Sequence, residues 1–163
     1  MAAAIAAVGI GVAPSASADP YDVLWKMVPP GYSEGSCQAA GPGDTLEPGA
    51  IAYVECHNNS LPGGPSVARY VLFSDVNALN SHFADIYYHS PMHFKAVACP
   101  GRPADATRWA GPGNNSGGSV GCGDTEGDMA VVSWTNDSGP LVAWAEGPDL
   151  NALYGWWSTV IGG

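Results

Sequence analysis

The apolar positions of the chain repeat one helical stripe, first from residue 75 and again from residue 149. Each copy opens with an aspartate, a residue that caps helix starts well, and then carries the same Asn-Ala-Leu core. Apolar residues recur in steps of three and four along both copies, as they do on the buried face of a helix. Aligning the copies matches Val76 with Leu150, Leu79 with Leu153, and Phe83 with Trp157. The pattern predicts two helices, over about residues 75–88 and 149–160.

Shorter runs of apolar residues predict strands. One run precedes each helix, at residues 67–73 and 141–145, and others lie at residues 50–56, 119–122 and 129–135. Segments rich in Gly, Asn, Asp and Pro separate the runs, as in a sheet of strands joined by turns. Residues 21–28 form a short amphipathic piece that Pro29 and Pro30 end, and the pattern fits either a helical turn or an edge strand.

Together these elements predict an α+β domain with a mostly antiparallel sheet and two helices packed on one face. Because a strand followed by a helix occurs twice, we expect a duplicated strand-helix unit. Its repeat units cover about residues 37–90 and 94–163, with a pseudo-two-fold relation between them. The 163 residues are about one domain long, and a hydrophobic content of 46% is enough for a core.

The first residues have the composition of an export signal. Residues 1–18 carry no charge, are apolar through the middle and end in Ala-Ser-Ala, a cleavage site of small residues. We expect residues 1–18 to be a signal peptide and residues 19–163 to be a single secreted domain, located outside the cell or in the cell envelope. No later segment is apolar for long enough to span a membrane, so we expect no membrane insertion after cleavage.

The four cysteines predict two disulfides in an exported chain, and three connectivities are possible. The repeat favours pairing within each unit, Cys37 with Cys56 and Cys99 with Cys122. Each bridge would close a loop of roughly 20 residues and contribute roughly 3 kcal/mol in the chain-entropy model. A zinc site is the alternative, but the close Cys-x-x-Cys pairs that it needs are absent from the sequence.

The charge balance limits the possible partners. The formal net charge is −10, and the five basic residues are scattered. A phosphate backbone or an anionic membrane surface would repel such a chain, so we expect no nucleic-acid partner and no binding to lipid headgroups.

The sequence offers weak candidates for catalysis. Residues 31–35 match the Gly-x-Ser-x-Gly pattern of a nucleophile elbow around Ser33, and His57 and Asp44 are nominal triad partners. An elbow needs a sharp turn between a strand and a helix, whereas here two prolines precede it and a cysteine loop follows. We therefore predict no catalytic residue and no enzyme activity, with a secreted hydrolase as the rival hypothesis.

Metal sites are also predicted to be absent. His89 and His93 have the spacing of a helical metal pair, but Pro91 lies between them, and His57 and His82 are expected at the surface. Residues 124–129 begin like a calcium loop, yet Met129 stands where the loop needs glycine. We expect a polar hairpin tip there, and no cofactor.

The six tryptophans are the remaining candidates for a binding surface. Trp134 and Trp144 are expected on neighbouring strands, and exposed indoles there would make a flat stacking platform for sugar rings or for apolar envelope components. Burial is the favoured alternative, because each buried aromatic side chain contributes on the order of 2 to 3 kcal/mol. Trp156 is expected to stay partly exposed, since it lies about 100° around the helix from Trp157. Possible ligand contacts are therefore Trp134, Trp144 and Trp156.

Several segments of the second unit resemble a known group of domains. Ala-Cys-Pro-Gly at residues 98–101, Trp109, Gly-Ser-Val-Gly-Cys ending at Cys122, and residues 132–137 and 141–157 are similar to small cysteine-paired extracytoplasmic domains of actinobacteria. Such domains occur as free secreted proteins, notably in mycobacteria, and behind the membrane helix of bacterial serine/threonine kinases. The resemblance implies a location outside the cytoplasmic membrane and a sensing or binding role.

The chain itself carries no kinase signature: the glycine-rich phosphate loop, His-Arg-Asp and Asp-Phe-Gly are all absent. The leading hypothesis is a secreted, disulfide-stabilised, non-catalytic binding or sensor module, whose partner is an envelope glycan, a small ligand or another protein. A structural or inhibitory secreted protein is the third alternative.

Overall fold

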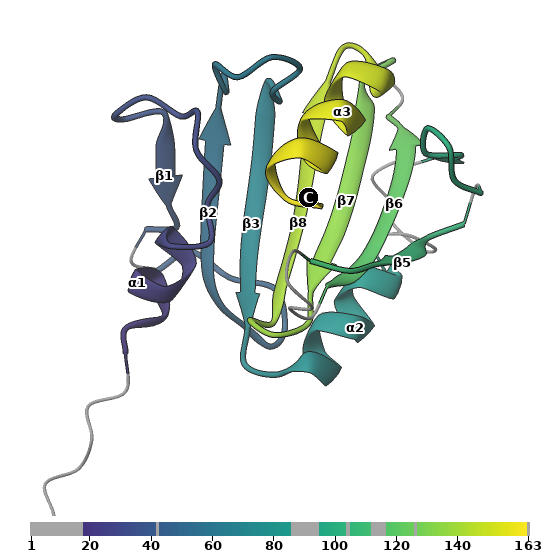
Figure 1. Ribbon diagram of the computed structural model, residues 1–163. Coiled ribbons are helices and arrows are strands. Elements are labelled where there is room, and N and C mark those ends of the chain that lie inside the picture. Colours follow the sequence, from purple (N-terminus) through teal and green to yellow (C-terminus); the bar gives the residue numbers. More distant parts are fainter. Residues whose placement is uncertain are drawn as a thin grey trace, which may run out of the picture.

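In a computed structural model, residues 18–41, 43–85, 95–103, 105–111, 117–125 and 127–162 are described. They form an α+β domain in which helices pack on an eight-stranded sheet (Figure 1). The helices are α1 (Pro20–Trp25), α2 (Val76–Ala84) and α3 (Leu150–Val160). The strands are β1 (Cys37–Ala39), β2 (Ala50–His57), β3 (Val67–Phe73), β4 (Lys95–Val97), β5 (Thr107–Trp109), β6 (Gly118–Asp124), β7 (Ala130–Asn136) and β8 (Leu141–Gly147). The predicted α+β class is confirmed.

The strands of the two predicted repeat units occupy separate halves of the sheet. The order is β1-β2-β3-β8-β7-β6-β4, with β5 also paired to β6, and each pairing between described strands is antiparallel. The halves meet where β3 pairs with β8. A helix follows each of these two central strands, so the strand-helix unit does occur twice.

The aspartates that open the apolar stripes cap their helices, as predicted. The Asp75 carboxylate accepts hydrogen bonds from the backbone N–H groups of Asn77 and Ala78. The Asp149 carboxylate accepts one from Ala152. These bonds satisfy amide groups that have no partner inside the helix, and so they fix where α2 and α3 begin.

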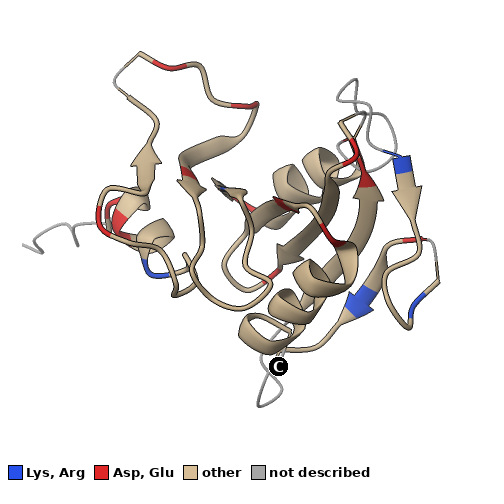
Figure 2. Ribbon diagram, turned by 90° about the horizontal axis from the view of Figure 1, so that it is seen from above, with Lys and Arg blue, Asp and Glu red and all other residues tan. Residues whose placement is uncertain are grey.

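The prediction that both helices pack on one face of the sheet is wrong. Leu79 and Phe83 of α2 are buried in a cluster with Val71, Phe73 and Val142. The apolar side of α3 belongs to a second cluster, which includes Leu153, Trp157, Tyr70, Leu72, Trp134 and Ala143. Since neighbouring residues of a strand point to opposite faces, Leu72 and Phe73 place α3 and α2 on opposite sides of the sheet. Figure 2, seen from above, shows a helix on either side of the central strands.

The register between the two central strands explains this arrangement. Phe73, two residues before the cap Asp75, faces α2, and Gly147, two residues before Asp149, lies against Leu153 of α3. The two units are therefore alike locally. However, β3 and β8 pair with Leu72 opposite Leu141, so Phe73 and Gly147 point to opposite faces. A two-fold axis normal to the sheet would have kept both helices on one face, and the expected pseudo-symmetry is absent.

Helix α3 is flanked on one side by the segment that follows Cys99, while its outer side, with Asn151, Gly155 and Ser158, is exposed. The Trp109 ring of β5 makes an edge contact with Trp157, at 5.6 Å between ring centroids. Arg102 donates a hydrogen bond of 2.6 Å from Nε to the Tyr154 hydroxyl. In Figure 1 this segment lies on the same side of the sheet as α3. The helix thus packs on the sheet with Trp109 of β5 against Trp157, and both Trp156 and Trp157 are buried.

Both predicted disulfides are confirmed, Cys37 with Cys56 and Cys99 with Cys122. The first joins paired residues of β1 and β2, and the second joins the segment after β4 to β6. Strands β1, β4 and β5 were not predicted, because each is three residues long. The signal-peptide prediction falls on residues outside the described range, except for residue 18, and so does the predicted last turn of the first helix. None of the helices among the described residues has the length and hydrophobicity of a membrane span.

Candidate binding pocket

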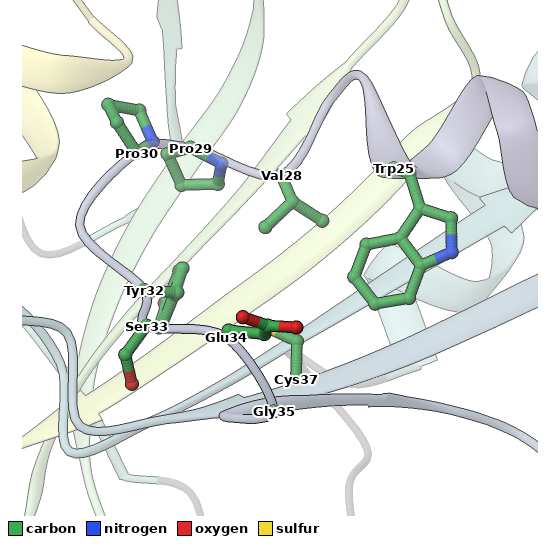
Figure 3. A pocket seen from close by; sticks show the side chains of 9 residues that line it. All are labelled: Trp25, Val28, Pro29, Pro30, Tyr32, Ser33, Glu34, Gly35 and Cys37. Carbon is green, nitrogen blue, oxygen red and sulfur yellow. The ribbon is translucent and has the colours of Figure 1, made fainter.

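A pocket of about 310 Å³ opens beside α1, between this helix and the segment that leads into β1 (Figure 3). Its volume is near the lower end for sites that bind small molecules. The wall is mostly apolar and carries one ionisable carboxylate. The lining residues are Trp25, Val28, Pro29, Pro30, Tyr32, Ser33, Glu34, Gly35 and Cys37.

Helix α1 positions the aromatic side of the pocket. It is only six residues long, with Asp19 as its N-cap and Pro20 at its start, and the pair Pro29 and Pro30 prevents the helix from continuing. Leu24 is fully buried and anchors the helix on the sheet. The next residue, Trp25, keeps 41% of its surface exposed, unusually much for a large apolar side chain. It is presented to solvent by a helix that packing holds in place.

The opposite wall depends on a glycine. Gly31 has a φ of 105°, which residues with side chains rarely adopt, and an added Cβ would stand 2.3 Å from Oδ1 of Asn59. The Gly31 carbonyl accepts hydrogen bonds of 2.8 Å from both the N–H and the hydroxyl of Ser60. The Asn59 side chain donates one to the Pro30 carbonyl. The turn between β2 and β3 thereby holds the proline segment in shape.

Tyr32 joins the pocket to the core. Its hydroxyl lies 2.9 Å from that of the fully buried Tyr70, and the two rings make an edge contact. Tyr70 in turn touches the Trp134 ring, which touches Trp156. Burial raises the pKa of Tyr32 in spite of its hydrogen bonds to Tyr70 and Asn59. The phenol is therefore a neutral, already bonded group, and it offers its ring rather than its hydroxyl to a ligand.

The floor near Cys37 is fixed by the first disulfide and by a tight turn. Ser36 donates from its N–H and its hydroxyl to the Ser33 carbonyl, and the His57 N–H donates to the Ser36 carbonyl. The Cys37–Cys56 bridge ties the end of this turn to β2. The pocket is therefore largely preformed, and a ligand would order little of the chain on binding.

The nominal catalytic residues do not assemble. Ser33 lies at the pocket, but in Figure 3 its hydroxyl points away from the cavity. The His57 ring is bonded to Glu55 at 2.9 Å, and the Asp44 carboxylate accepts from the Gly41 N–H. Asp44 follows the end of β1 that pairs with Val54, whereas His57 ends β2 beyond Cys56. An eight-residue strand spans roughly 25 Å, so Asp44 and His57 belong to opposite ends of this hairpin.

The three tryptophans expected as possible ligand contacts do not form one surface. Trp134 and Trp156 are 1% and 2% exposed, so the expectation that Trp156 stays partly exposed is wrong and core packing is confirmed for both. Trp134 and Trp144 do lie on neighbouring strands, as predicted. However, Trp144 pairs with Ser133, and its ring therefore points to the other face of the sheet from Trp134.

Trp144 instead lies beside an ion cluster on the face that α2 covers in part. The Arg69 guanidinium is 5.8 Å from the Trp144 ring centroid and forms ion pairs with Glu55 and Glu146. Burial raises the pKa of Glu55, but the hydrogen bonds from Arg69 and Tyr53 outweigh this and lower it overall. Burial and the Glu55 charge raise the pKa of Tyr53 to about 12. Each charge already has its partner within the protein, so the cluster stabilises the sheet rather than offering a free binding group.

The structure does not bring the candidate metal ligands together among the described residues. His89 and His93 lie outside the described residues. Of the others, His82 is not on the polar side of its helix as expected, because its ring packs on Phe73 at 5.0 Å between centroids. Between β6 and β7, the Thr125 N–H donates to the Met129 carbonyl and the Asp128 N–H donates to the Thr125 carbonyl, and Asp128 has a φ of 56°, as expected for a hairpin tip. Within the described ranges, no group of three His, Cys, Asp or Glu residues could hold a metal ion.

The pocket was not found from the sequence. The amphipathic pattern of residues 21–28 predicts a helical turn or an edge strand, and α1 confirms the first, but the pattern does not indicate that Trp25 is exposed. The available signal was two aromatic residues, Trp25 and Tyr32, on either side of Pro29 and Pro30. Aromatic and proline side chains cover binding surfaces at little cost in conformational entropy.

Charge is distributed unevenly between acids and bases. Figure 2 shows Asp and Glu over many loops and strand ends, with Lys and Arg at a few separated places.

Comparison of the chain with models of protein families, with curated proteins and with solved structures found no match.

Proposed function

We propose that the chain is an exported, non-catalytic binding module that works outside the cytoplasmic membrane, with the pocket beside α1 as its binding site. The observation that carries the proposal is that Trp25 stays 41% exposed at a cavity, although the buried Leu24 beside it anchors the helix in the core. An exposed aromatic residue at a pocket costs stability that burial would recover, and such residues are typical of recognition sites.

Two further observations support this function. The disulfides, one in each half of the sheet, are typical of proteins that fold in an oxidising compartment. The pocket's ionisable or hydroxyl-bearing side chains are Tyr32, Ser33 and Glu34, and none of them is paired with a histidine that could serve as a general base. The resemblance to extracytoplasmic kinase domains points in the same direction, toward sensing of an envelope glycan, a small ligand or another protein.

Thermal unfolding in the presence of envelope fractions from an actinobacterium tests the proposal. A ligand at about 100 times its Kd stabilises the folded state by about 2.7 kcal/mol, and the melting temperature should then rise by several degrees. Trp25→Ala should abolish this rise. Trp144→Ala, which removes a partly exposed tryptophan on the other face, is the matched control and should retain it.

The proposal fails if no fraction raises the melting temperature, or if the rise persists in Trp25→Ala. Turnover of ester or peptide substrates by the purified protein, lost in Ser33→Ala, would establish the rival hydrolase instead.

A further inference from the structure

We propose that the pocket beside α1 binds an organic cation, in which an ammonium group, methylated or free, is carried on a small apolar body. This inference rests on the proposed function, because it names the class of ligand that the same pocket takes. It depends on the identity of the lining side chains and on how they face one another.

The single charge on the pocket wall is negative. Glu34 lines the cavity together with Trp25 and Tyr32, and Lys and Arg are absent from the lining. In Figure 3 the Glu34 carboxylate lies between the Trp25 indole and the Tyr32 ring. Unlike Glu55 and Glu146, which share Arg69, it lies at a cavity that supplies no cation of its own. A ligand cation would complete the ion pair.

The aromatic rings favour the same class of ligand. The faces of Trp and Tyr rings attract cations, most strongly those with weakly held hydration shells such as methylated ammonium groups. Trp25 is free to offer its ring because 41% of its surface is exposed. The Tyr32 hydroxyl is occupied by Tyr70, so this residue also contributes its ring. Val28 and Pro29 supply apolar contacts for the rest of the ligand.

Two other ligand classes fit the lining less well. An anion would meet the Glu34 carboxylate and no positively charged side chain, in a protein whose net charge is −10. A sugar ring needs several hydrogen-bonding side chains arranged around it. The hydroxyls of Ser33 and Tyr32 do not provide them, because the first points away and the second is bonded to Tyr70.

Calorimetric titration of the disulfide-bonded protein with choline tests the inference. The comparison ligand is 3,3-dimethylbutan-1-ol, which has the same shape with carbon in place of the charged nitrogen. We expect choline to bind at least about tenfold more tightly than the alcohol, and its affinity to fall as NaCl is added. Glu34→Gln should weaken choline binding about tenfold and leave the alcohol unchanged.

Two variants serve as controls. Glu47→Gln removes the same charge from the loop before β2, away from the lining, and should keep the wild-type affinity for choline. Trp25→Ala should lose choline binding. Phosphatidylcholine vesicles in a parallel experiment distinguish the source of the cation. Binding of vesicles that Glu34→Gln weakens supports the ammonium chemistry on a lipid headgroup, whereas binding of free choline alone supports a soluble amine.

Equal affinity for choline and the alcohol would overturn the inference, as would choline binding that Glu34→Gln does not change. Either result would leave the proposed binding function standing. Absence of choline and vesicle binding would also refute the inference alone, provided that envelope fractions still raise the melting temperature in a Trp25-dependent manner. If those fractions fail as well, both proposals are wrong.

Discussion

At the scale of single residues, His82 is a partly buried ionisable side chain packed against an apolar cluster. Its ring packs on Phe73, and its Nε2 is buried without a hydrogen-bond partner among the described residues. Loss of solvation lowers the pKa of His82, in spite of Glu47 and Asp85, whose charges raise it. The folded state therefore favours the neutral imidazole, while the unfolded chain takes up a proton at the ordinary pKa of about 6.5.

Stability should consequently fall as the pH drops below about 6.5, because the unfolded chain then binds more protons than the folded one. His82→Phe keeps a ring against Phe73 and removes the buried nitrogen. We expect this variant to lose less stability than the wild type between neutral and mildly acidic pH, and to be more stable by about 1 kcal/mol at the acidic end.

Urea unfolding at the two pH values measures this difference. His57→Gln, which alters an exposed histidine bonded to Glu55, is the control. If the pH dependence of His82→Phe equals that of the wild type, the neutral state of His82 in the fold is disproved.

The tryptophans of α3 show what sequence could and could not tell about single residues. Trp156 and Trp157 are about 100° apart around the helix, so only one of them can lie at the centre of the apolar stripe. If the helix buries a single face, Trp156 is expected to be partly exposed. The structure buries both, since Trp134 covers one side and Trp109 the other. The position of β5 depends on the disulfide loop after Cys99 and is not encoded in the helical pattern. The available warning was that Tyr154, Trp156 and Trp157 make the apolar side of α3 wider than a single stripe.

At the scale of elements, each disulfide holds a short edge strand against the sheet. The cysteines that the two bridges join are 19 and 23 positions apart along the chain. Loop closure of this length contributes about 3 kcal/mol in each case. We predict that replacing both cysteines of either pair with serine lowers the free energy of unfolding by a similar amount, measured by urea unfolding.

The two disulfide variants should differ in ligand binding. Cys37 lines the pocket, whereas Cys99 and Cys122 lie in the other half of the sheet. Loss of the first bridge should therefore abolish the ligand-induced rise in melting temperature, and loss of the second should preserve it. If loss of the Cys37–Cys56 bridge preserves the rise and loss of the Cys99–Cys122 bridge abolishes it, the ligand does not bind at the pocket beside β1.

Elements were predictable where local pattern decides them. The capping aspartates and apolar stripes located the starts of α2 and α3, and apolar runs located five strands. The face on which each helix packs was not predictable, because it depends on the register between Leu72 and Leu141 across the centre of the sheet. A shift of that register by one residue would have turned the side chains of one strand to the opposite face of the sheet. Repeated sequence therefore indicated repeated elements without fixing their symmetry.

At the scale of the whole molecule, the sheet separates two apolar clusters. Leu79 belongs to the cluster under α2 and Leu153 to the cluster under α3. We expect Leu79→Val and Leu153→Val each to lower the free energy of unfolding by about 1 to 2 kcal/mol. Because the residues share no cluster, the double variant should equal the sum within about 0.5 kcal/mol.

Leu153→Val combined with Val132→Ala is the matched pair, since both residues lie in one cluster. Its loss of unfolding free energy should differ by more than about 0.5 kcal/mol from the sum of the two single losses. Urea unfolding of the single and double variants provides the values. Strong coupling between positions 79 and 153, equal to that of the matched pair, would contradict the placement of the helices on opposite faces.

The pocket was the least predictable feature because it forms only where segments that are distant in sequence meet in the folded molecule. Its walls come from α1 and from the segment before β1, while the turn around Asn59 and Ser60 keeps them in place. These pieces are separated in sequence by up to about 35 residues, and the local pattern of each indicates only a short helix or a loop. The disulfide prediction placed Cys37 beside Cys56 correctly but said nothing of a cavity there.

The most direct test of the binding site is a proton–nitrogen correlation spectrum of the six tryptophan indoles, recorded with and without an envelope fraction that raises the melting temperature. We expect the indole signal of Trp25 to move while those of Trp134 and Trp156 stay in place, because these two are buried in the core. If the Trp144 signal moves and that of Trp25 does not, the ligand binds on the other face of the sheet and the pocket beside α1 is not the binding site.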